Sequence, residues 1–91
     1  LCLIKYETEE EAIKIANDTP YGLAGYVQGE QAHAVEIASK IRAGQVTINK
    51  GARVRSAPFG GYGSSGNGRE HGTHGLEECL ETKAVIGALV E

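Results

Sequence analysis

"LAGYVQGEQAHAVEIASKIRAGQVTIN" (residues 23–49) contains two strand-like runs separated by a helical pattern. The first run (23–27) is apolar, and the second (45–49) alternates polar and apolar residues and includes β-branched side chains, as strands do. Between them, within residues 31–42, apolar side chains recur at the spacing of one helix face: Ala34, Val35, Ala38 and Ile41. The order strand, helix, strand predicts an α/β fold in which at least part of the sheet is parallel.

Further elements are expected on both sides of this unit. "LCLIKY" (1–6) is a continuous apolar run, which is typical of a strand buried on both faces of a parallel sheet. Thr8 followed by Glu11 forms a capping box, which predicts a helix that ends near Pro20. After a glycine-rich segment, "LEECLE" (76–81) predicts a short helix and "KAVIGALV" (83–90) a last strand. Because the chain begins within an apolar strand, we expect it to be part of a larger protein.

Composition excludes several classes of function. The chain has 91 residues, enough for one domain at most, and its net charge of −3 argues against a general affinity for nucleic acid or for an anionic membrane. No apolar run approaches the length of a membrane span, and residues 1–6 lack the basic-then-apolar order of a signal peptide, so we expect a cytoplasmic protein. The basic residues Lys50, Arg53 and Arg55 are expected to lie in a solvated loop.

The cysteines and histidines suggest no metal site and no disulfide. Cys2 and Cys79 lie at opposite ends of the chain, and both are expected to fill space rather than to react. The three histidines are scattered, and none has a partner that the sequence reveals. His33 is expected on a solvated helix face, and His71 and His74 are expected to be exposed.

The glycine-rich segment "APFGGYGSSGNGREHG" (57–72) contains a G-x-G-x-x-G match at Gly61, Gly63 and Gly66. A dinucleotide fingerprint requires these glycines directly between a strand and a helix, and here Pro58 precedes them while further glycines follow. A Walker A motif is absent as well. The segment therefore indicates a tightly folded loop with large side chains as anchors, namely Phe59, Tyr62 and Arg69, rather than a phosphate-binding loop.

"PFGGYGSSGNGRE" (58–70) closely resembles a segment near the C-terminus of NAD(P)-dependent aldehyde dehydrogenases. Residues 10–27, 41–49 and 75–85 also resemble segments of that family, in the same order. The resemblance implies an α/β fold that is part of the family's parallel-sheet catalytic domain, plus a terminal oligomerisation strand. Residues 1–82, including the glycine-rich loop 50–75, would be the C-terminal part of the thiol-bearing catalytic domain, and residues 83–91 the oligomerisation strand.

The resemblance also implies an activity. Members of the family oxidise an aldehyde to a carboxylic acid with NAD or NADP through a cysteine thiohemiacetal. Their catalytic cysteine, glutamate and asparagine match no residue of this chain, and "LCLIKY" does not resemble the sequence around the nucleophile, so Cys2 is not assigned that role. We expect the fragment alone to be inactive and to bind no cofactor, and the sequence does not decide between NAD and NADP.

The resemblance assigns one residue to the substrate site. Phe59 falls where family members often have an aromatic residue in the wall of the substrate tunnel, with ordinary packing as the alternative. Residues 51–54 resemble the stretch that shapes the tunnel mouth. Gly63 stands where the family usually has lysine, and Arg69 and Glu70 resemble structural residues that hold the loop by an ion pair or hydrogen bond.

The last strand (83–90) would pair with a neighbouring subunit, which implies a homo-oligomer, either a dimer or a tetramer. An ordinary intramolecular strand is the alternative. Two other functions remain open: a non-catalytic assembly module that pairs through this strand and, with less support, a small nucleotide-binding protein.

Overall fold

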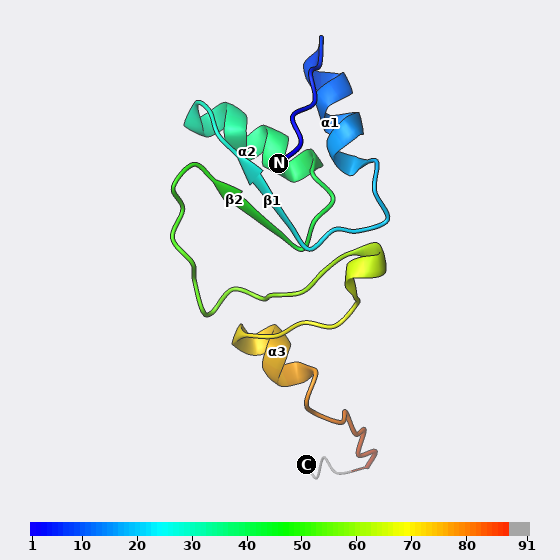
Figure 1. Cartoon of the computed structure of the whole chain (residues 1–91). Helices are drawn as coiled ribbons and strands as arrows, with labels where there is room; N and C mark the ends of the chain where they lie inside the picture. Colours follow the sequence, from blue (N-terminus) through cyan, green and yellow to red (C-terminus); the bar gives the residue numbers. More distant parts are fainter. Residues whose placement is uncertain (88–91) are drawn as a thin grey trace.

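The computed structural model describes residues 1–87, and the fold is α/β (Figure 1). The elements in chain order are α1 (Glu9–Asn17), β1 (Ala24–Val27), α2 (Gln31–Lys40), β2 (Gln45–Ile48), the 3₁₀ turn η1 (Gly63–Ser65) and α3 (Gly72–Glu77). β1 and β2 form a two-stranded parallel sheet, and α2 is the crossover helix that packs on both strands. The predicted α/β class and the parallel pairing are therefore confirmed.

The register of the sheet runs from Ala24 opposite Gln45 to Val27 opposite Ile48. Asn49 closes the end of both strands: its N–H donates to the Val27 carbonyl at 2.8 Å, and its side-chain oxygen accepts from the Gly29 N–H at 3.0 Å. Asn49 has a φ of 53°, a conformation that asparagine tolerates better than most residues. Asn49, the first residue after β2, thus also binds the turn that follows β1.

The start of α2 is fixed by Glu30. Its carboxylate accepts from the N–H groups of Ala32 and His33 at 3.1 and 2.9 Å, and so occupies the N-cap. The hydrogen bond from the His33 N–H, followed by that from Ala32, lowers the pKa of Glu30. Ala34, one turn into α2, is only 2% exposed and is the only buried apolar side chain among residues 1–87.

The predicted capping of α1 is confirmed. The Thr8 hydroxyl accepts from the Glu11 N–H at 3.2 Å, and the Glu11 carboxylate accepts from the Glu7 N–H at 2.8 Å. Glutamates in the first turn and Lys14 in the last are placed favourably for the helix dipole. The helix ends at Asn17, three residues before Pro20, as the sequence predicts.

Two polar contacts join α1 to α2. The Asn17 side chain donates to the Lys40 carbonyl at 2.9 Å and accepts from the Arg42 N–H at 2.8 Å, which satisfies backbone groups at the end of α2. Near the start of both helices, the His33 imidazole contacts the Glu9 carboxylate. His33 is exposed, with 53% of its side-chain surface accessible, as predicted for a solvated helix residue.

The glycine-rich loop returns to the beginning of β1 at Gly22, which is buried. The Gly22 carbonyl accepts from the N–H groups of Gly44 and Tyr62 at 3.0 and 2.8 Å. The Gly22 N–H donates to the Ser65 hydroxyl at 2.9 Å. Through these bonds one residue connects the β1–α2–β2 unit with the loop that follows it.

Three sequence-based predictions differ from the structure. Residues 1–6 form no strand, because β1 and β2 pair with each other and the described chain offers no strand beside them. The short helix covers residues 72–77 rather than 76–81, since Gly75, which we expected to precede the helix, lies inside it where a Cβ would press on the Glu70 backbone. Residues 83–87 form no strand, and residues 88–90 of that prediction lie outside the described residues.

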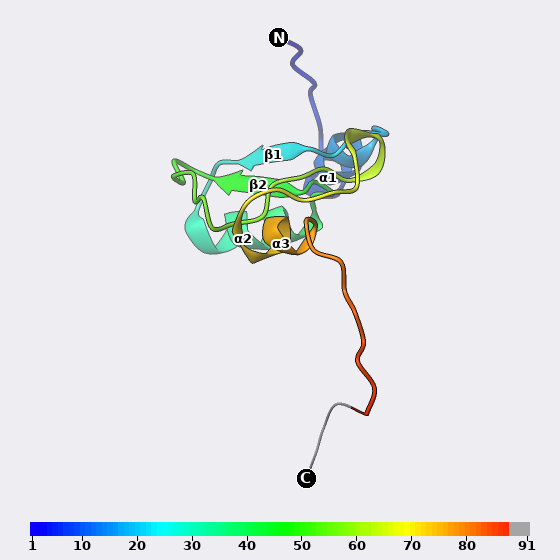
Figure 2. The same cartoon turned by 90° about the horizontal axis from the view of Figure 1, so that it is seen from below.

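The two ends of the chain extend away from the central unit on opposite sides (Figure 2), and the molecule measures 64 × 27 × 23 Å. Many large apolar side chains are exposed, and those at the two ends of the described chain include Leu1, Leu3, Leu80, Val85 and Ile86. Cys2 and Cys79 are also exposed, so neither fills space in this chain as predicted. Within residues 1–87, none of the helices has both the length and the apolar character needed to cross a membrane.

The contact between His33 and Glu9 predicts a pH-dependent link between α1 and α2. The hydrogen bond from the His33 ring to the Glu9 carboxylate, and then the charge of Glu9, raise the pKa of His33, with further contributions from Glu36 and Glu30. A raised folded-state pKa means that the contact stabilises the fold below the unfolded pKa of about 6.5 and is lost as the pH rises through the folded-state value. In an NMR titration, Glu9→Gln should lower the pKa of His33.

Glu10→Gln is the matched control, because Glu10 lies next in the same helical turn without a hydrogen bond to His33 among the described contacts. An unchanged His33 pKa in Glu9→Gln, or an equal drop in both variants, would contradict the link.

Candidate functional site

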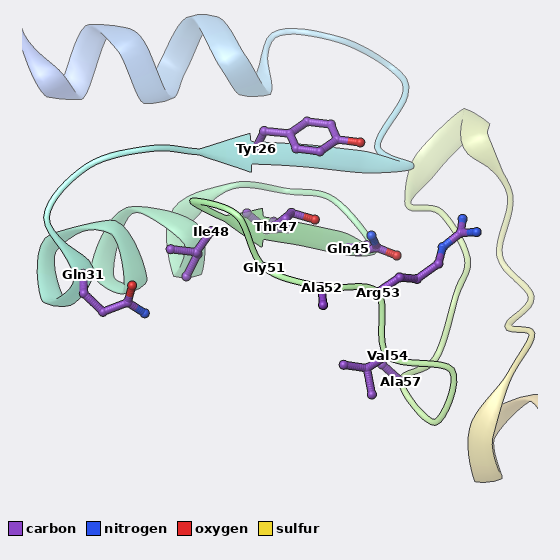
Figure 3. A pocket seen from close by; sticks show the side chains of 11 residues that line it. Tyr26, Gln31, Gln45, Thr47, Ile48, Gly51, Ala52, Arg53, Val54 and Ala57 are labelled. Atoms are coloured by element: carbon purple, nitrogen blue, oxygen red, sulfur yellow. The ribbon is translucent and has the colours of Figure 1, made fainter.

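A hollow lies between β2 and the loop that follows it (Figure 3). It has a volume of about 680 Å³. One wall is the sheet, with Tyr26 from β1 and Gln45 and Thr47 from β2, and the other is the loop. All four residues of the predicted tunnel mouth, Gly51–Val54, line this hollow, together with Ala57.

The polar side chains of this hollow come from both walls. In Figure 3, Gln45 and Arg53 lie on the same side, while Val54 and Ala57 form an apolar side. Arg53 is exposed, as predicted for the basic residues of this loop. The hollow combines amide, hydroxyl and guanidinium groups with apolar carbon, which suits recognition of a small organic molecule better than general acid–base chemistry.

Phe59 lines a second hollow, of about 400 Å³, on the glycine-rich loop. Leu23, Ser65 and Arg69 also contribute to it. Phe59 is half-buried. The structure therefore places the predicted tunnel-wall residue and the predicted tunnel-mouth residues in two separate hollows of this chain.

A small clasp in the loop fixes the backbone of Phe59. Phe59 and Glu70 form an antiparallel bridge in which each N–H donates to the other's carbonyl, at 2.8 and 2.6 Å. The Arg69 guanidinium donates to the carbonyls of Gly61 and Gly68 at 3.0 and 2.8 Å and lies over the Tyr62 ring. The predicted hydrogen-bonding role of Arg69 in holding the loop is confirmed.

His71 stacks on the ring of Phe59, with ring centroids 5.9 Å apart and an angle of 28° between the rings. His71 is exposed, as the sequence predicts, and the stacking on Phe59 is a contact that the sequence did not indicate. Because Glu70 pairs with Phe59, the side chain of His71, the next residue, lies against the Phe59 ring. The sequence separation of twelve residues between Phe59 and His71 does not predict this contact. His74, three residues further on, has no such contact with Phe59 among the described ones.

The G-x-G-x-x-G match does not form a phosphate-binding loop. Neither described strand leads directly into Gly61, because β2 ends at Ile48, and the element that follows directly is the 3₁₀ turn η1 rather than an α-helix. The N–H groups of Tyr62 and Ser64 donate to the carbonyls of Gly22 and Pro20, and those of Ser65 and Gly66 donate within the turn. These are the groups that a dinucleotide pyrophosphate would need, so the arrangement does not fit this ligand.

Gly63, which stands where we expected lysine from the family pattern, has a φ of 54°. A Cβ at this position would press on the Pro20 carbonyl oxygen. The Ser64 N–H donates to the same oxygen at 2.7 Å. In this backbone conformation the position requires glycine.

Comparisons with known proteins agree on one family. The family model described as "Aldehyde dehydrogenase family" matches residues 1–85. A 3-succinoylsemialdehyde-pyridine dehydrogenase from Pseudomonas sp. is 53% identical over 88 residues, which are 96% of this chain and 18% of that protein.

Solved structures give the same result. Aldehyde dehydrogenase C from Pseudomonas syringae, a variant in complex with NAD+ and octanal, superposes with a TM-score of 0.92 and 59% identity over 96% of this chain and 18% of that one. An aldehyde dehydrogenase from Mycobacterium tuberculosis in complex with NAD+ gives 0.82 and 44%, over 93% of this chain and 18% of that one. The chain spans about 18% of the length of these relatives. With the match over residues 1–85 and these identities, the chain belongs to the aldehyde dehydrogenase family.

Proposed function

We propose that this chain is the C-terminal portion of an NAD(P)-dependent aldehyde dehydrogenase that oxidises an aldehyde to a carboxylic acid through a cysteine thiohemiacetal. The observation that carries the proposal is the superposition, over 96% of the chain, on an enzyme that was solved with NAD+ and octanal. The same share of the chain corresponds to only 18% of that enzyme. The catalytic cysteine, glutamate and asparagine would lie in the remainder.

NAD or NADP would be the cofactor of the proposed enzyme, and we expect no binding site for it among residues 1–87 of this chain. The glycine loop is closed by its own hydrogen bonds, as described above. The nucleotide would accept the hydride of the aldehyde carbon, and residues outside this chain would hold it. This chain would instead help to shape the substrate tunnel and the neighbouring surface.

Phe59 is proposed for the wall of the substrate tunnel and residues 51–54 for its mouth. Phe59 is half-buried beside a hollow, and both of its backbone groups are hydrogen-bonded to Glu70. Its ring stacks on His71. A fixed aromatic ring provides apolar contact area at little entropic cost, which suits the binding of an apolar aldehyde chain. The exposed residues 51–54 lie on a loop, where substrate specificity is commonly determined.

A second candidate, a non-catalytic assembly module, is favoured by the C-terminal extension. Val85 and Ile86 are 69% and 96% exposed, together with Leu76 and Leu80 upstream. Exposed apolar side chains in a row are typical of a protein interface. In the whole enzyme the same surface would join subunits into a dimer or a tetramer.

The first prediction concerns activity. The 91-residue chain mixed with octanal and NAD+ or NADP+ should reduce no nicotinamide above background, because a missing nucleophile lowers turnover by roughly 10⁴-fold or more. A subunit that includes these residues together with the preceding catalytic segments should oxidise aldehydes, followed by the absorbance of the reduced nicotinamide. Turnover by the 91-residue chain at the rate of the longer subunit would contradict the proposed division of the protein.

The second prediction concerns assembly. Ile86→Asp should shift the chain from an oligomer to a monomer in sedimentation velocity, since a carboxylate in an apolar contact is costly to desolvate. Val35→Asp is the matched control, because it places the same charge at an exposed apolar position on α2 and should leave association unchanged. If Ile86→Asp sediments as the unchanged protein does, the C-terminal surface is not the interface.

A further inference from the structure

His71 has an unusual backbone conformation for a residue with a side chain. Its φ is 66° and its ψ 154°, and the following residue, Gly72, also has a positive φ of 60°. This region of backbone conformation is populated almost only by glycine, so a residue with a side chain is strained there. A structure keeps such strain where the placement of the side chain is useful, so the direction of the His71 ring is informative.

The strained backbone directs the imidazole onto Phe59. The stacked rings, 5.9 Å apart at 28°, are a favourable aromatic pair. The two hydrogen bonds between Phe59 and Glu70 already fix the backbone at Phe59 and at the residue that precedes His71. What remains free at Phe59 is the rotation of its side chain, and His71 covers one side of that ring.

We propose that His71 is a positioning residue that fixes the ring of Phe59 in one rotamer. The fixed ring would set the width of the substrate tunnel at the point where an aldehyde with an apolar chain contacts Phe59. This inference rests on the proposed function, in particular on Phe59 as part of the tunnel wall. His71 acts through Phe59, so it affects how an apolar aldehyde binds rather than the reacting atoms.

The contact itself is testable in the 91-residue chain. Ring currents of Phe59 should shift the imidazole protons of His71 upfield in the NMR spectrum, and Phe59→Leu should abolish the shift. The protons of His74 serve as an internal control, because this ring does not stack on Phe59 among the described contacts. Equal His71 shifts in the wild-type chain and in Phe59→Leu would overturn the inference.

The consequence is testable in the aldehyde dehydrogenase subunit that includes these residues. His71→Ala keeps the Cβ and hence the backbone preference, and should raise KM for octanal roughly two- to tenfold, the range for loss of an aromatic pair, with kcat nearly unchanged. His71→Phe restores a stacking ring and should return KM toward the wild-type value. His74→Ala, the matched control, should leave both constants unchanged.

A double-mutant cycle separates positioning from general structural support. If His71 acts through Phe59, His71→Ala should have no further effect on KM in a Phe59→Ala background. Independent, additive effects on KM, or an equal fall in kcat for octanal and for a short aldehyde, would overturn the inference while leaving the proposed function intact. A subunit that oxidises no aldehyde with either nucleotide would overturn the proposed function, and the tunnel role of His71 with it.

Discussion

The backbone of Gly22 makes three hydrogen bonds that join the β1–α2–β2 unit to the glycine-rich loop. Its carbonyl accepts from Gly44, at the start of β2, and from Tyr62, in the glycine-rich loop, and its N–H donates to Ser65. A Cβ at this position would lie 2.6 Å from the Arg42 carbonyl oxygen and 3.0 Å from the Tyr62 Cβ. Only glycine allows this approach, and the two loop residues that bind Gly22, Tyr62 and Ser65, lie between Phe59 and Glu70, which form the clasp.

The importance of these backbone contacts follows from how little apolar surface the chain buries. Ala34 is its single buried apolar side chain within residues 1–87, whereas large apolar side chains are exposed on both extensions. Local structure is therefore maintained by helix caps, by the Asn17 and Asn49 side chains and by the parallel pairing, rather than by a core. An aldehyde dehydrogenase about five times longer has ample chain to cover these exposed surfaces, which is consistent with the proposed function.

Sequence patterns predicted the elements whose determinants lie close together in the chain. The Thr8 cap and the apolar periodicity of residues 31–42 depend on neighbours within one or two turns, and the structure has both helices. Strands 1–6 and 83–90 depend instead on a partner strand, which this chain does not supply to residues 1–6 or 83–87. The bounds of α3 differ because the glycine-rich loop was expected to extend to Gly75, which instead lies inside the helix, where a Cβ would press on the Glu70 backbone. The stacking of His71 on Phe59 follows from the backbone bridge between Phe59 and Glu70. Helix and strand periodicities do not predict a bridge between two loop residues.

Hydrogen exchange at the Tyr62 amide tests most directly whether Gly22 joins the loop to the sheet. In Gly22→Ala this amide should exchange roughly tenfold faster or more, because the bond to the Gly22 carbonyl is lost, while the amides within α2 keep their protection. Gly29→Ala is the matched control, since a Cβ there has no neighbour within 4 Å and the N–H remains available to Asn49. Exchange at Tyr62 as slow in Gly22→Ala as in the unchanged chain would contradict the account.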